Sequence, residues 1–505
     1  MIDRHLSKLI TKLTSLERIG ERDPEISSVV FDSREAEAGS LFFALPGVHV
    51  NGHDFIDKAL DSGACAVVHT EVPASYRPGI NYIRVPDTRS ALSPVSAAFW
   101  GRPSREMKVI GVTGTDGKST TVSLIRQLLG FSGMSAGSIS TVDFTIGEKS
   151  GSNYLRQSTP EAPQIHGLLR AMLNAGQTHA VVEATSHGLS PKNSRLADVD
   201  FDAAVFTNVT SEHLEFHGNL ENYRADKARL FRMIGASGNR DAFGVVNADD
   251  PHADLFIEAA GEKPVFTYSL KYHDADLFAT DMKPGPGGTR FTLHTPLGST
   301  ETRIKLPGLY NVENALAALC TVAELQDEDA VDLAGYLPEL TGVKGRMEPV
   351  PGDMDFNVMV DYAHSPGSFR KILPFLKSLT EGRLIVVFGS GGERDIDKRP
   401  EQGALAAEYA DIVFLTDEDP RGENPMSILE DIAAGAPGLK RNKELFLIPD
   451  RREALGEAFK KAGEGDLVAV LGKGHESSII YAEGAIKWDE AEACREALKA
   501  LGYDA

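Results

Sequence analysis

The segment "VIGVTGTDGKST" (109–120) constrains the fold more strongly than any other part of the sequence. Apolar residues typical of a strand run into Gly114 and Gly117, and an amphipathic helical pattern begins at Lys118. Glycines let backbone N–H groups point at phosphate oxygens, and a helix N-terminus adds a favourable dipole. Val112 stands where the full G-x-x-x-x-G-K-[ST] signature has its first glycine. The segment therefore predicts a phosphate-binding loop that holds ATP in an α/β domain.

The rest of the chain alternates between strand and helix patterns. Strand candidates at 178–184, 201–208 and 242–248 follow the loop and are separated by helical stretches, which is typical of a mainly parallel sheet. The stretch 279–308 differs, because it alternates with period two between Gly/Pro turns, and we expect a β-hairpin inserted in this domain. After residue 353 the α/β alternation resumes.

Two breaks divide the 505 residues, a length that favours about three domains. "GRPSRE" (101–106) and "TGVKGRMEPVPGD" (341–353) are rich in Pro, Gly and charge. We predict a small N-terminal α/β domain (1–104), a central P-loop α/β domain with the inserted hairpin (105–342) and a Rossmann-like α/β domain (343–505).

Composition excludes several classes of protein. A net charge of −21 opposes general nucleic-acid binding, which needs a basic face. The three cysteines are far apart and form no metal-binding or disulfide pattern, as expected in a reducing cytoplasm. No signal-peptide core or membrane-spanning apolar run is evident. We expect a cytoplasmic protein with small-molecule substrates, without nucleic-acid or membrane partners.

Several motifs together resemble one family. "GTDGKST" is similar to the G-T-x-G-K-[ST] loop of the Mur ligases, which build the peptidoglycan stem peptide. Residues 31–68 resemble the UDP-binding domain of the third enzyme in that series. Further family motifs occur in the same order as in those enzymes: "STPEAP" (158–163), "VVEATSHGL" (181–189), "FTNVTSEHLEFHG" (206–218), "YRADKARLF" (223–231), "GLYNVENALAA" (308–318), "GVKGRMEPV" (342–350), "VDYAHSP" (360–366), "GSGGERDIDKRP" (389–400), "DEDPRGENP" (417–425) and "GKGHE" (472–476).

The resemblance implies a two-step, ATP-dependent ligation. A substrate carboxylate takes the γ-phosphoryl group of ATP, and an amine then attacks the acyl phosphate. Cations must neutralise the anions that meet in the first step. The family therefore implies two Mg²⁺ ions, the UDP-muramoyl dipeptide and a diamino acid as substrates, and roles in cell-wall synthesis, cell shape and cell division. We expect a monomer.

The resemblance assigns the ATP and metal residues. Lys118 lies over the phosphates, and Ser119, Glu183, His213 and Lys227 hold Mg²⁺, with Lys227 as an N6-carboxylysine. Only a neutral amine reacts with CO₂, and burial favours the neutral form of lysine. Lys118, His213 and Lys227 are the implied catalytic residues. The implied ATP-binding residues are Gly114, Thr115, Asp116, Gly117, Lys118, Ser119, Thr120, Asn314, Arg346, Asp361 and His364.

The other two substrates have their own residues in the resemblance. Those implied to bind the UDP-muramoyl dipeptide are Ser33, Ser158, Thr159, Thr185 and Arg195. The segment before Arg195 is about two residues longer, at Pro191–Lys192, than the family pattern. Those implied to bind the amino acid are Arg394, Glu418, Asp419, Pro420, Arg421, Gly472 and Glu476.

Residues 418–421 bear on which amino acid is added. Relatives that add meso-diaminopimelate carry D-N-P-R, whose arginine suits bidentate binding of a carboxylate that lysine lacks. Here Arg421 is present, but Glu418 and Asp419 replace Asp-Asn. Arg421 favours diaminopimelate, whereas the added negative charge favours lysine or ornithine.

Two other classes of function stay open at this point. One is another Mur-type amide ligase, such as the D-alanyl-D-alanine-adding enzyme or folylpolyglutamate synthase, against which the N-terminal block, "DEDPR" and "GKGHE" argue. The other is a non-catalytic ATP-binding switch or scaffold, which the joint presence of Lys118, Glu183, His213 and Lys227 disfavours.

Overall fold

The computed structural model of the chain describes residues 2–47, 50–73, 75–153, 155, 157–210, 217–285 and 288–505. Its contacts divide the chain into two compact units. The first comprises Met1–Met282, Phe291–Thr302 and Tyr310–Leu340, and the second comprises Lys283–Arg290, Arg303–Leu309 and Thr341–Ala505. The domain boundaries at 104 and 342 stay a prediction.

The N-terminal sheet has the strand order β1-β5-β4-β3-β2. Its strands are β1 (Glu17–Ile19), β2 (Val29–Val30), β3 (Leu41–Phe43), β4 (Ala66–His69) and β5 (Asn81–Arg84). The strands β2 to β5 are parallel, and β1 is antiparallel to β5. Residues of α1 (Leu6–Leu9) and α3 (Thr88–Phe99) form one core beside the sheet, and those of η1 (Gly52–Phe55) and α2 (Ile56–Asp61) belong to another.

The central sheet has the order β16-β15-β14-β13-β12-β11-β6-β10-β7-β8-β9. Its strands are β6 (Lys108–Thr113), β7 (Ala136–Ile139), β8 (Asp143–Ile146), β9 (Lys149–Ser152), β10 (His179–Glu183), β11 (Ala203–Phe206), β12 (Phe243–Asn247), β13 (Val265–Ser269), β14 (Leu277–Gly285), β15 (Gly288–Thr295) and β16 (Gly298–Ile304). The strand β6 lies between β10 and β11 and is parallel to both. The carboxyl ends of these three strands therefore meet at one edge, where α/β proteins bind ligands.

The helices around the central sheet are η2 (Pro103–Arg105), α4 (Lys118–Phe131), α5 (Ala162–Asn174), α6 (Ser186–Leu189), α8 (Leu220–Gly235), α9 (Ala253–Ala259), α10 (Leu309–Gln326), α11 (Ala330–Leu333) and η3 (Ala334–Glu339). Apolar residues of α5, α8 and α9 share one core with alternate residues of β6, β10 and β11. Alternation along a strand sends the intervening residues, such as Ile110 and Val112, to the opposite face.

The stretch expected to form one inserted hairpin contains three strands in the part of the chain that the structure describes. β14, β15 and β16 follow one another at the edge of the central sheet. The strand β14 pairs in parallel with β13, so these strands continue the sheet. The difference arises from a second turn, between Thr295 and Gly298, which ends β15 and begins β16.

The second unit contains a sheet with the order β17-β18-β22-β19-β20-β21. Its strands are β17 (Glu348–Pro349), β18 (Asn357–Asp361), β19 (Leu384–Phe388), β20 (Ile412–Leu415), β21 (Leu445–Leu447) and β22 (Leu467–Leu471). All neighbours except β17 and β18 pair in parallel. A separate antiparallel pair joins β23 (Ser478–Tyr481) to β24 (Gly484–Lys487).

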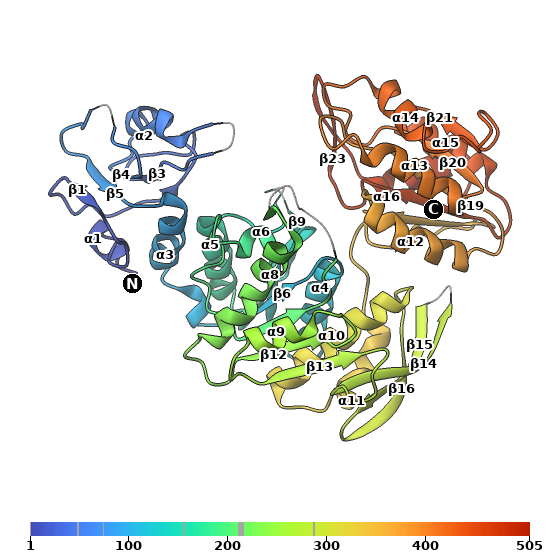
Figure 1. Cartoon of the computed structure of the whole chain (residues 1–505), viewed down its shortest axis with the longest axis horizontal. Helices are drawn as coiled ribbons and strands as arrows, with labels where there is room; N and C mark the ends of the chain where they lie inside the picture. The colour runs from blue at the N-terminus through green and yellow to red at the C-terminus, as the bar shows by residue number, and fades with distance from the viewer. Residues whose placement is uncertain are drawn as a thin grey trace. The chain divides into compact units, whose positions relative to one another are not determined.

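Helices cover both faces of this second sheet (Figure 1). One core includes α12 (Pro366–Leu379), α13 (Lys398–Tyr409) and α14 (Pro425–Ala433). The other includes α15 (Arg451–Lys461) and α16 (Glu490–Ala500). The resulting α/β/α layers place the loops after β18, β19, β20 and β22 at one end of the sheet.

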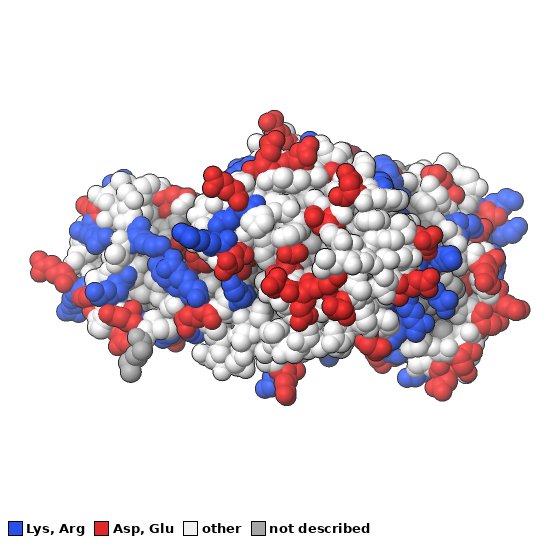
Figure 2. All heavy atoms as spheres, turned by 90° about the horizontal axis from the view of Figure 1, so that it is seen from below, with Lys and Arg blue, Asp and Glu red and all other residues white. Residues whose placement is uncertain are grey.

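Figure 2 shows basic and acidic side chains mixed at the two ends of the face that it presents, and a cluster of acidic side chains near the middle of that face. Within the described residues, none of the helices is both long and apolar enough to span a bilayer.

Candidate functional site

The loop after β6 has the conformation that its glycines predict. Gly114 has φ of +151° and Gly117 has φ of +82°. A Cβ on Gly114 would lie 1.9 Å from the Thr207 hydroxyl oxygen, and one on Gly117 would lie 2.3 Å from the Asn314 side-chain oxygen. Both positions therefore require glycine for conformation and for space.

Neighbouring strands fix the rest of this loop. The Thr115 amide donates to the Asn208 carbonyl at 2.7 Å, and the Asp116 amide donates to the Asn208 side-chain oxygen at 3.0 Å. The Thr207 hydroxyl donates to the Asp116 carbonyl at 2.6 Å. Thr120 follows on the first turn of α4. The residues that follow β11 thus hold the loop in place, and α4 begins directly after the loop, at Lys118.

Three polar groups of the predicted phosphate site meet at the ends of β6 and β10. The Lys118 ammonium donates to the Thr115 carbonyl at 2.7 Å. The Ser119 hydroxyl donates to Glu183 Oε2 at 2.8 Å, and Glu183 is 2% exposed. The Thr141 amide and hydroxyl each donate to Glu183 at 2.9 Å, so the carboxylate is held in one orientation.

Lys227 lies on the other side of the same loop. It is 1% exposed, and its ammonium donates to the Gly114 carbonyl at 2.5 Å. The ammonium also lies 4.4 Å from the centre of the Tyr223 ring. The structure therefore turns Lys227 from α8 toward the phosphate loop, which a surface lysine on a helix would not do.

The oxygen atoms at this place suit Mg²⁺, since a hydroxyl and a carboxylate are ligands that this cation prefers. Ser119 and Glu183 supply them 2.8 Å apart. His213 lies outside the described residues. Among those described, no group of three or more His, Cys, Asp and Glu side chains has the arrangement of a metal site. Ser119 and Glu183 therefore fit as two protein ligands of a Mg²⁺ ion, whose other ligands substrate and water would supply.

Residues expected to hold the muramoyl peptide lie beside Glu183. The Thr159 hydroxyl donates to the Glu183 carbonyl at 2.7 Å and lies 2.9 Å from the Thr185 hydroxyl. Arg195 donates to the Thr159 carbonyl at 3.0 Å and pairs with Glu161 at 2.7 Å. The structure thus brings Arg195 to Thr159, which in turn contacts Thr185, despite the longer preceding segment.

The remaining predicted residues of the first unit have simpler surroundings. Ser158 precedes Thr159 and is partly exposed. Ser33 is 5% exposed and lies in the turn after β2, within the N-terminal sheet region. Asn314, on α10, accepts from the Thr121 hydroxyl at 3.2 Å and packs against Gly117. Asn314 therefore supports the phosphate loop directly.

Three predicted ATP-binding residues lie in the second unit around β18. The Asp361 carboxylate accepts from the Met347 and Ala363 amides, each at 2.8 Å. Burial raises the pKa of Asp361, while the nearby Arg346 guanidinium and these amides oppose that rise. The Arg346 guanidinium lies 4.7 Å from the centre of the Tyr362 ring.

His364 belongs to the same cluster as Tyr362. Its Nδ1 lies 2.9 Å from the Tyr362 carbonyl oxygen, and burial lowers the pKa of the imidazole. The rings of His364 and His475 lie 4.6 and 4.7 Å from the Tyr362 ring. Burial lowers the pKa of His475 to about 3 and raises that of Tyr362. The rings of Tyr362, His364 and His475 therefore form an uncharged cluster beside the Arg346 guanidinium.

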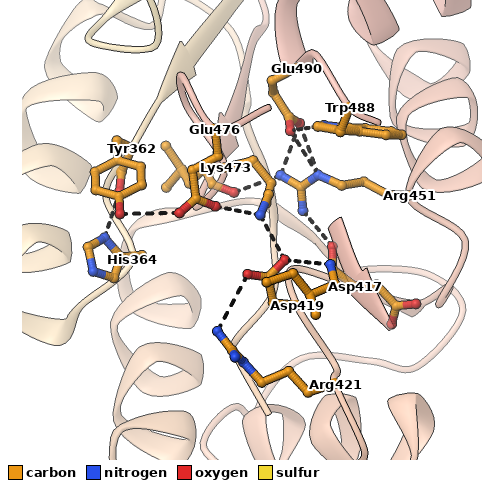
Figure 3. Close-up of polar contacts among 12 residues, drawn as sticks. Tyr362, His364, Asp417, Asp419, Arg421, Arg451, Lys473, Glu476, Trp488 and Glu490 are labelled. Atoms are coloured by element: carbon orange, nitrogen blue, oxygen red, sulfur yellow. Dashed lines mark hydrogen bonds and ion pairs between the residues drawn. The ribbon is translucent and has the colours of Figure 1, made fainter. Parts of the chain in front are cut away.

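The loops after β20 and β22 form the predicted amino-acid site (Figure 3). Lys473 is 0% exposed; its ammonium lies 2.9 Å from Asp419 Oδ1 and also pairs with Glu476 Oε2. The Arg421 guanidinium lies 3.9 Å from Asp419 Oδ2, and Glu476 Oε1 accepts from the Tyr362 hydroxyl at 3.4 Å. Hydrogen bonds and ion pairs therefore join Tyr362, Glu476, Lys473 and Asp419 in one row, and Arg421 lies at its end, beyond hydrogen-bond distance of Asp419.

Glu418 is the most deeply buried acid of this group. Burial raises its pKa to about 7, and the Lys398 and Lys473 ammonium groups oppose that rise. In the described part of the chain, Glu418 Oε2 and Arg421 Nε are both buried without a hydrogen-bond partner. Gly472 has φ of +104°, and a Cβ there would lie 2.9 Å from Glu418 Oε2. A larger residue than glycine would therefore displace Glu418.

The loop after β19 lies against the same site. The Gly392 amide donates to the Asp419 carbonyl at 2.8 Å, and a Cβ on Gly392 would lie 2.0 Å from the Pro420 carbonyl oxygen. Arg394 follows in this loop as an exposed residue. In the part of the chain that the structure describes, no hydrogen bond or ion pair is found that joins Arg394 to Glu418, Asp419 or Arg421.

A buried arginine supports both amino-acid loops from behind. Arg451, 1% exposed, donates to the Asp417 carbonyl at 3.0 Å and to the Leu471 carbonyl at 2.8 Å. Its Nε contacts both carboxylate oxygens of Glu490, at 3.0 and 3.1 Å. The Trp488 indole donates to Glu490 at 2.7 Å (Figure 3). This network fixes the residues that immediately precede Glu418 and Gly472.

Sequence reasoning missed three of these residues. Lys473 stands within the quoted "GKGHE" motif, and its place between two glycines was the available signal. Tyr362 stands within "VDYAHSP" in the same way. Thr141 had no signal, because only the folded sheet brings it to Glu183.

Family models cover most of the chain in three consecutive parts. "Mur ligase family, catalytic domain" matches residues 25–100, "Mur ligase middle domain" matches 112–322, and "Mur ligase, glutamate ligase domain" matches 345–474. The chain belongs to the Mur ligase family and is an enzyme of the ligase class.

Within this family the chain is similar to a particular set of enzymes. The "UDP-N-acetylmuramyl-tripeptide synthetase" of Roseiflexus sp. (strain RS-1) is 49% identical over 95% of this chain and 96% of the relative. The "UDP-N-acetylmuramoyl-L-alanyl-D-glutamate--2,6-diaminopimelate ligase" of Bacillus licheniformis is 37% identical over 98% and 99%. The resemblance expected from the sequence motifs is confirmed.

A solved structure confirms the predicted fold class. "Structure of UDP-N-acetylmuramoyl-L-alanyl-D-glutamate--2, 6-diaminopimelate ligase" matches with a TM-score of 0.65 and 31% identity, and covers 96% of this chain and 97% of that one. MurF of Acinetobacter baumannii shares the fold, with a TM-score of 0.66 at 20% identity. The chain has the three-domain α/β fold of Mur ligases.

Proposed function

We propose that this chain joins meso-diaminopimelate to UDP-N-acetylmuramoyl-L-alanyl-D-glutamate, with ATP as co-substrate. The named relatives, which align over nearly the whole chain, support the tripeptide-forming reaction. The observation that carries the choice of amino acid is Arg421, whose guanidinium lies in the loop after β20 beside Asp419. A planar guanidinium binds a carboxylate through two parallel hydrogen bonds, and lysine and ornithine lack that second carboxylate.

The first step transfers the γ-phosphoryl group of ATP to the glutamyl carboxylate, which forms an acyl phosphate and ADP. Lys118 lies at the N-terminus of α4, where its ammonium is positioned to donate to phosphate oxygens. At present that ammonium donates to the Thr115 carbonyl, a partner that a phosphate oxygen can replace. Thr159, Thr185 and Arg195 lie beside the strand that carries Glu183 and are positioned to orient the muramoyl peptide.

Ser119 and Glu183 would hold one Mg²⁺, and His213 with Lys227 as its carbamate would hold a second. Bound Mg²⁺ would neutralise charge on the phosphoryl oxygens as the two anions approach. Burial of Lys227 against Tyr223 supports the carbamate, because a buried site favours the neutral amine that takes up CO₂. Asn314, Arg346, Asp361 and His364 complete the proposed ATP contacts.

In the second step the amine of the diamino acid attacks the acyl carbon, and phosphate leaves. Asp419 and Glu476 would accept hydrogen bonds from that amine, and Arg421 would bind the distal carboxylate; the ion pairs that gather these side chains with Lys473 support this. Arg394, Pro420 and Gly472 would line the same site. Cytoplasmic location, monomeric state and a role in cell division stay predictions from the sequence.

A specific observation favours a second candidate, the same reaction with lysine or ornithine. Glu418 is buried with an unpartnered oxygen, and Asp419 adds another carboxylate to the site. Such a site favours an additional ammonium over an additional carboxylate.

One experiment separates the candidates. Phosphate release by the purified protein is measured with ATP, the UDP-muramoyl dipeptide and each of diaminopimelate, lysine and ornithine. We expect release to require both substrates and kcat/KM to be highest for diaminopimelate. Arg421→Ala should lower kcat/KM for diaminopimelate by roughly a hundredfold and leave lysine nearly unaffected. Release without either substrate indicates a plain ATPase, and a wild-type preference for lysine or ornithine contradicts the choice of diaminopimelate.

A further inference from the structure

The Lys473 ammonium lies between two carboxylates that the proposed function assigns to the amino-acid site. It is 2.9 Å from Asp419 Oδ1 and also pairs with Glu476, and its side chain has no exposed surface. A lysine in a solvated turn would instead extend into water, because a buried ammonium is costly unless it is paired. Its burial shows that Lys473 neutralises charge inside the site.

A second cation near Asp419 is the Arg421 guanidinium. Asp419 Oδ2 lies 3.9 Å from this guanidinium, too far for a hydrogen bond, whereas Asp419 Oδ1 accepts from both Lys473 and the Ile480 amide at 2.9 Å. Asp419 is thus satisfied mainly through Lys473 and the backbone. The Arg421 guanidinium is left without a close carboxylate from Asp419, and its Nε is buried without a partner in the described part of the chain.

We propose that Lys473 is a specificity-positioning residue: by holding Asp419, it keeps Arg421 free to bind the distal carboxylate of the diamino acid. Without the Lys473 ammonium, Asp419 would turn to Arg421 as its nearest cation, and the guanidinium would be neutralised within the protein. Substrates with a second carboxylate would then lose their partner, whereas lysine and ornithine would lose nothing comparable. This inference rests on the proposed function.

The charge at position 419 makes this role necessary in this chain. A relative with asparagine there presents no carboxylate to compete for the arginine, whereas Asp419 does. Glu476 on the other side of Lys473 is held in turn by the Tyr362 hydroxyl at 3.4 Å (Figure 3). Lys473 therefore holds both carboxylates, Asp419 on the side of Arg421 and Glu476 on the side of Tyr362.

The test measures selectivity, the ratio of kcat/KM for diaminopimelate to kcat/KM for lysine, in the full-length enzyme. We expect Lys473→Met to lower this ratio by about tenfold or more, from the interaction of one charge across the site. Lys473→Arg keeps the cation and should stay within about threefold of wild type. Lys344→Met removes a lysine from the exposed Lys344–Asp489 pair and should leave the ratio unchanged.

The double variant Lys473→Met/Asp419→Asn distinguishes this role from a structural one. Removing the competing carboxylate should return the ratio to within about threefold of wild type. A structural role for Lys473 would lower kcat/KM for both amino acids equally and leave the ratio unmoved, which overturns the proposal. Failure of the double variant to recover also overturns it.

Thermal unfolding checks that Lys473→Met folds. If it does not, Asp419→Asn alone decides: because Lys473 already holds Asp419 away from Arg421, the ratio should stay within about threefold of wild type, and a larger rise would show that Asp419 competes for Arg421 despite Lys473 and overturns the proposal. A wild-type preference for lysine would contradict the diaminopimelate assignment but leave these changes in ratio readable, so the two failures are distinguishable.

Discussion

Arg451 and Glu490 form an ion pair with almost no exposed surface, in which one guanidinium nitrogen contacts both carboxylate oxygens. The pair joins the first residue of α15 to the first residue of α16. Because Arg451 also binds the Asp417 and Leu471 carbonyls, it couples two helices to the loops of the amino-acid site.

Glu490→Gln should lower the free energy of unfolding of the second unit by about 3 kcal/mol, because it leaves a buried guanidinium without its charge partner. Urea unfolding followed by Trp488 fluorescence in a Trp100→Phe background measures this loss. Glu496 lies on α16, as Glu490 does, and forms an exposed pair with Arg452 of α15. Glu496→Gln should lower the free energy of unfolding by less than about 1 kcal/mol. Equal losses in the two variants would contradict the prediction.

Lys118→Ala should reduce phosphate release by about a hundredfold or more, because the proposed function assigns its ammonium to the phosphates of ATP. Steady-state release with saturating substrates measures the loss. Lys108→Ala on the preceding strand removes a lysine that pairs with Asp202 at the surface, and it should stay near wild-type activity. A small effect at Lys118 would show that the loop does not hold the reacting phosphates.

Lys227→Ala should be inactive, and formate or acetate should restore part of the activity by supplying the missing carboxylate oxygens. The measurement is turnover as a function of added acid. Lys118→Ala provides the comparison, because an added anion cannot replace an ammonium. Unchanged turnover in Lys227→Ala would refute the carbamate.

Glu418→Gln should gain stability relative to wild type as the pH rises from about 5 to about 8. Burial raises the pKa of Glu418 from 4.5 to about 7. Between these values the folded chain holds a proton that the unfolded chain has released, so wild-type stability falls as pH rises. The difference should approach about 3 kcal/mol, and urea midpoints at both pH values measure it. A difference independent of pH would contradict the prediction.

His166→Phe should show the opposite pH dependence. His166 is fully buried, both its ring nitrogens lack partners among the described residues, and burial lowers its pKa from 6.5 to about 3. Below about pH 6, His166 takes up a proton in the unfolded chain but not in the folded chain, so the stability of the wild type falls on acidification. The variant should gain up to about 2 kcal/mol on wild type between about pH 8 and about pH 5. Thermal midpoints of both proteins, measured across that pH range, test this. A difference in midpoint that does not change with pH would contradict the prediction.

Local sequence predicted the phosphate loop well, because a strand, a glycine turn and a helix N-terminus lie within twelve consecutive residues (109–120). The pairing of Ser119 with Glu183 spans 64 positions and depended on family resemblance. Neither pattern nor resemblance indicated that Thr141 would orient Glu183, since a polar residue after a strand usually reads as a turn.

The second unit shows the same limit. Glu490 begins an amphipathic helix and has the sequence surroundings of a solvated first-turn acid, yet it is 0% exposed. Its burial depends on Arg451, which is 39 positions away, and no periodicity encodes such a pairing. His213, which the family motif predicts as a metal ligand, lies outside the described residues.

Two lysines donate hydrogen bonds to the backbone of the phosphate loop, Lys118 to the Thr115 carbonyl and Lys227, from α8, to the Gly114 carbonyl. Both side chains are therefore already oriented, so under the proposed function little rotamer freedom would be lost when a nucleotide binds at Lys118 or CO₂ reacts at Lys227. Each of the two amines would exchange one hydrogen bond to the backbone for its proposed partner.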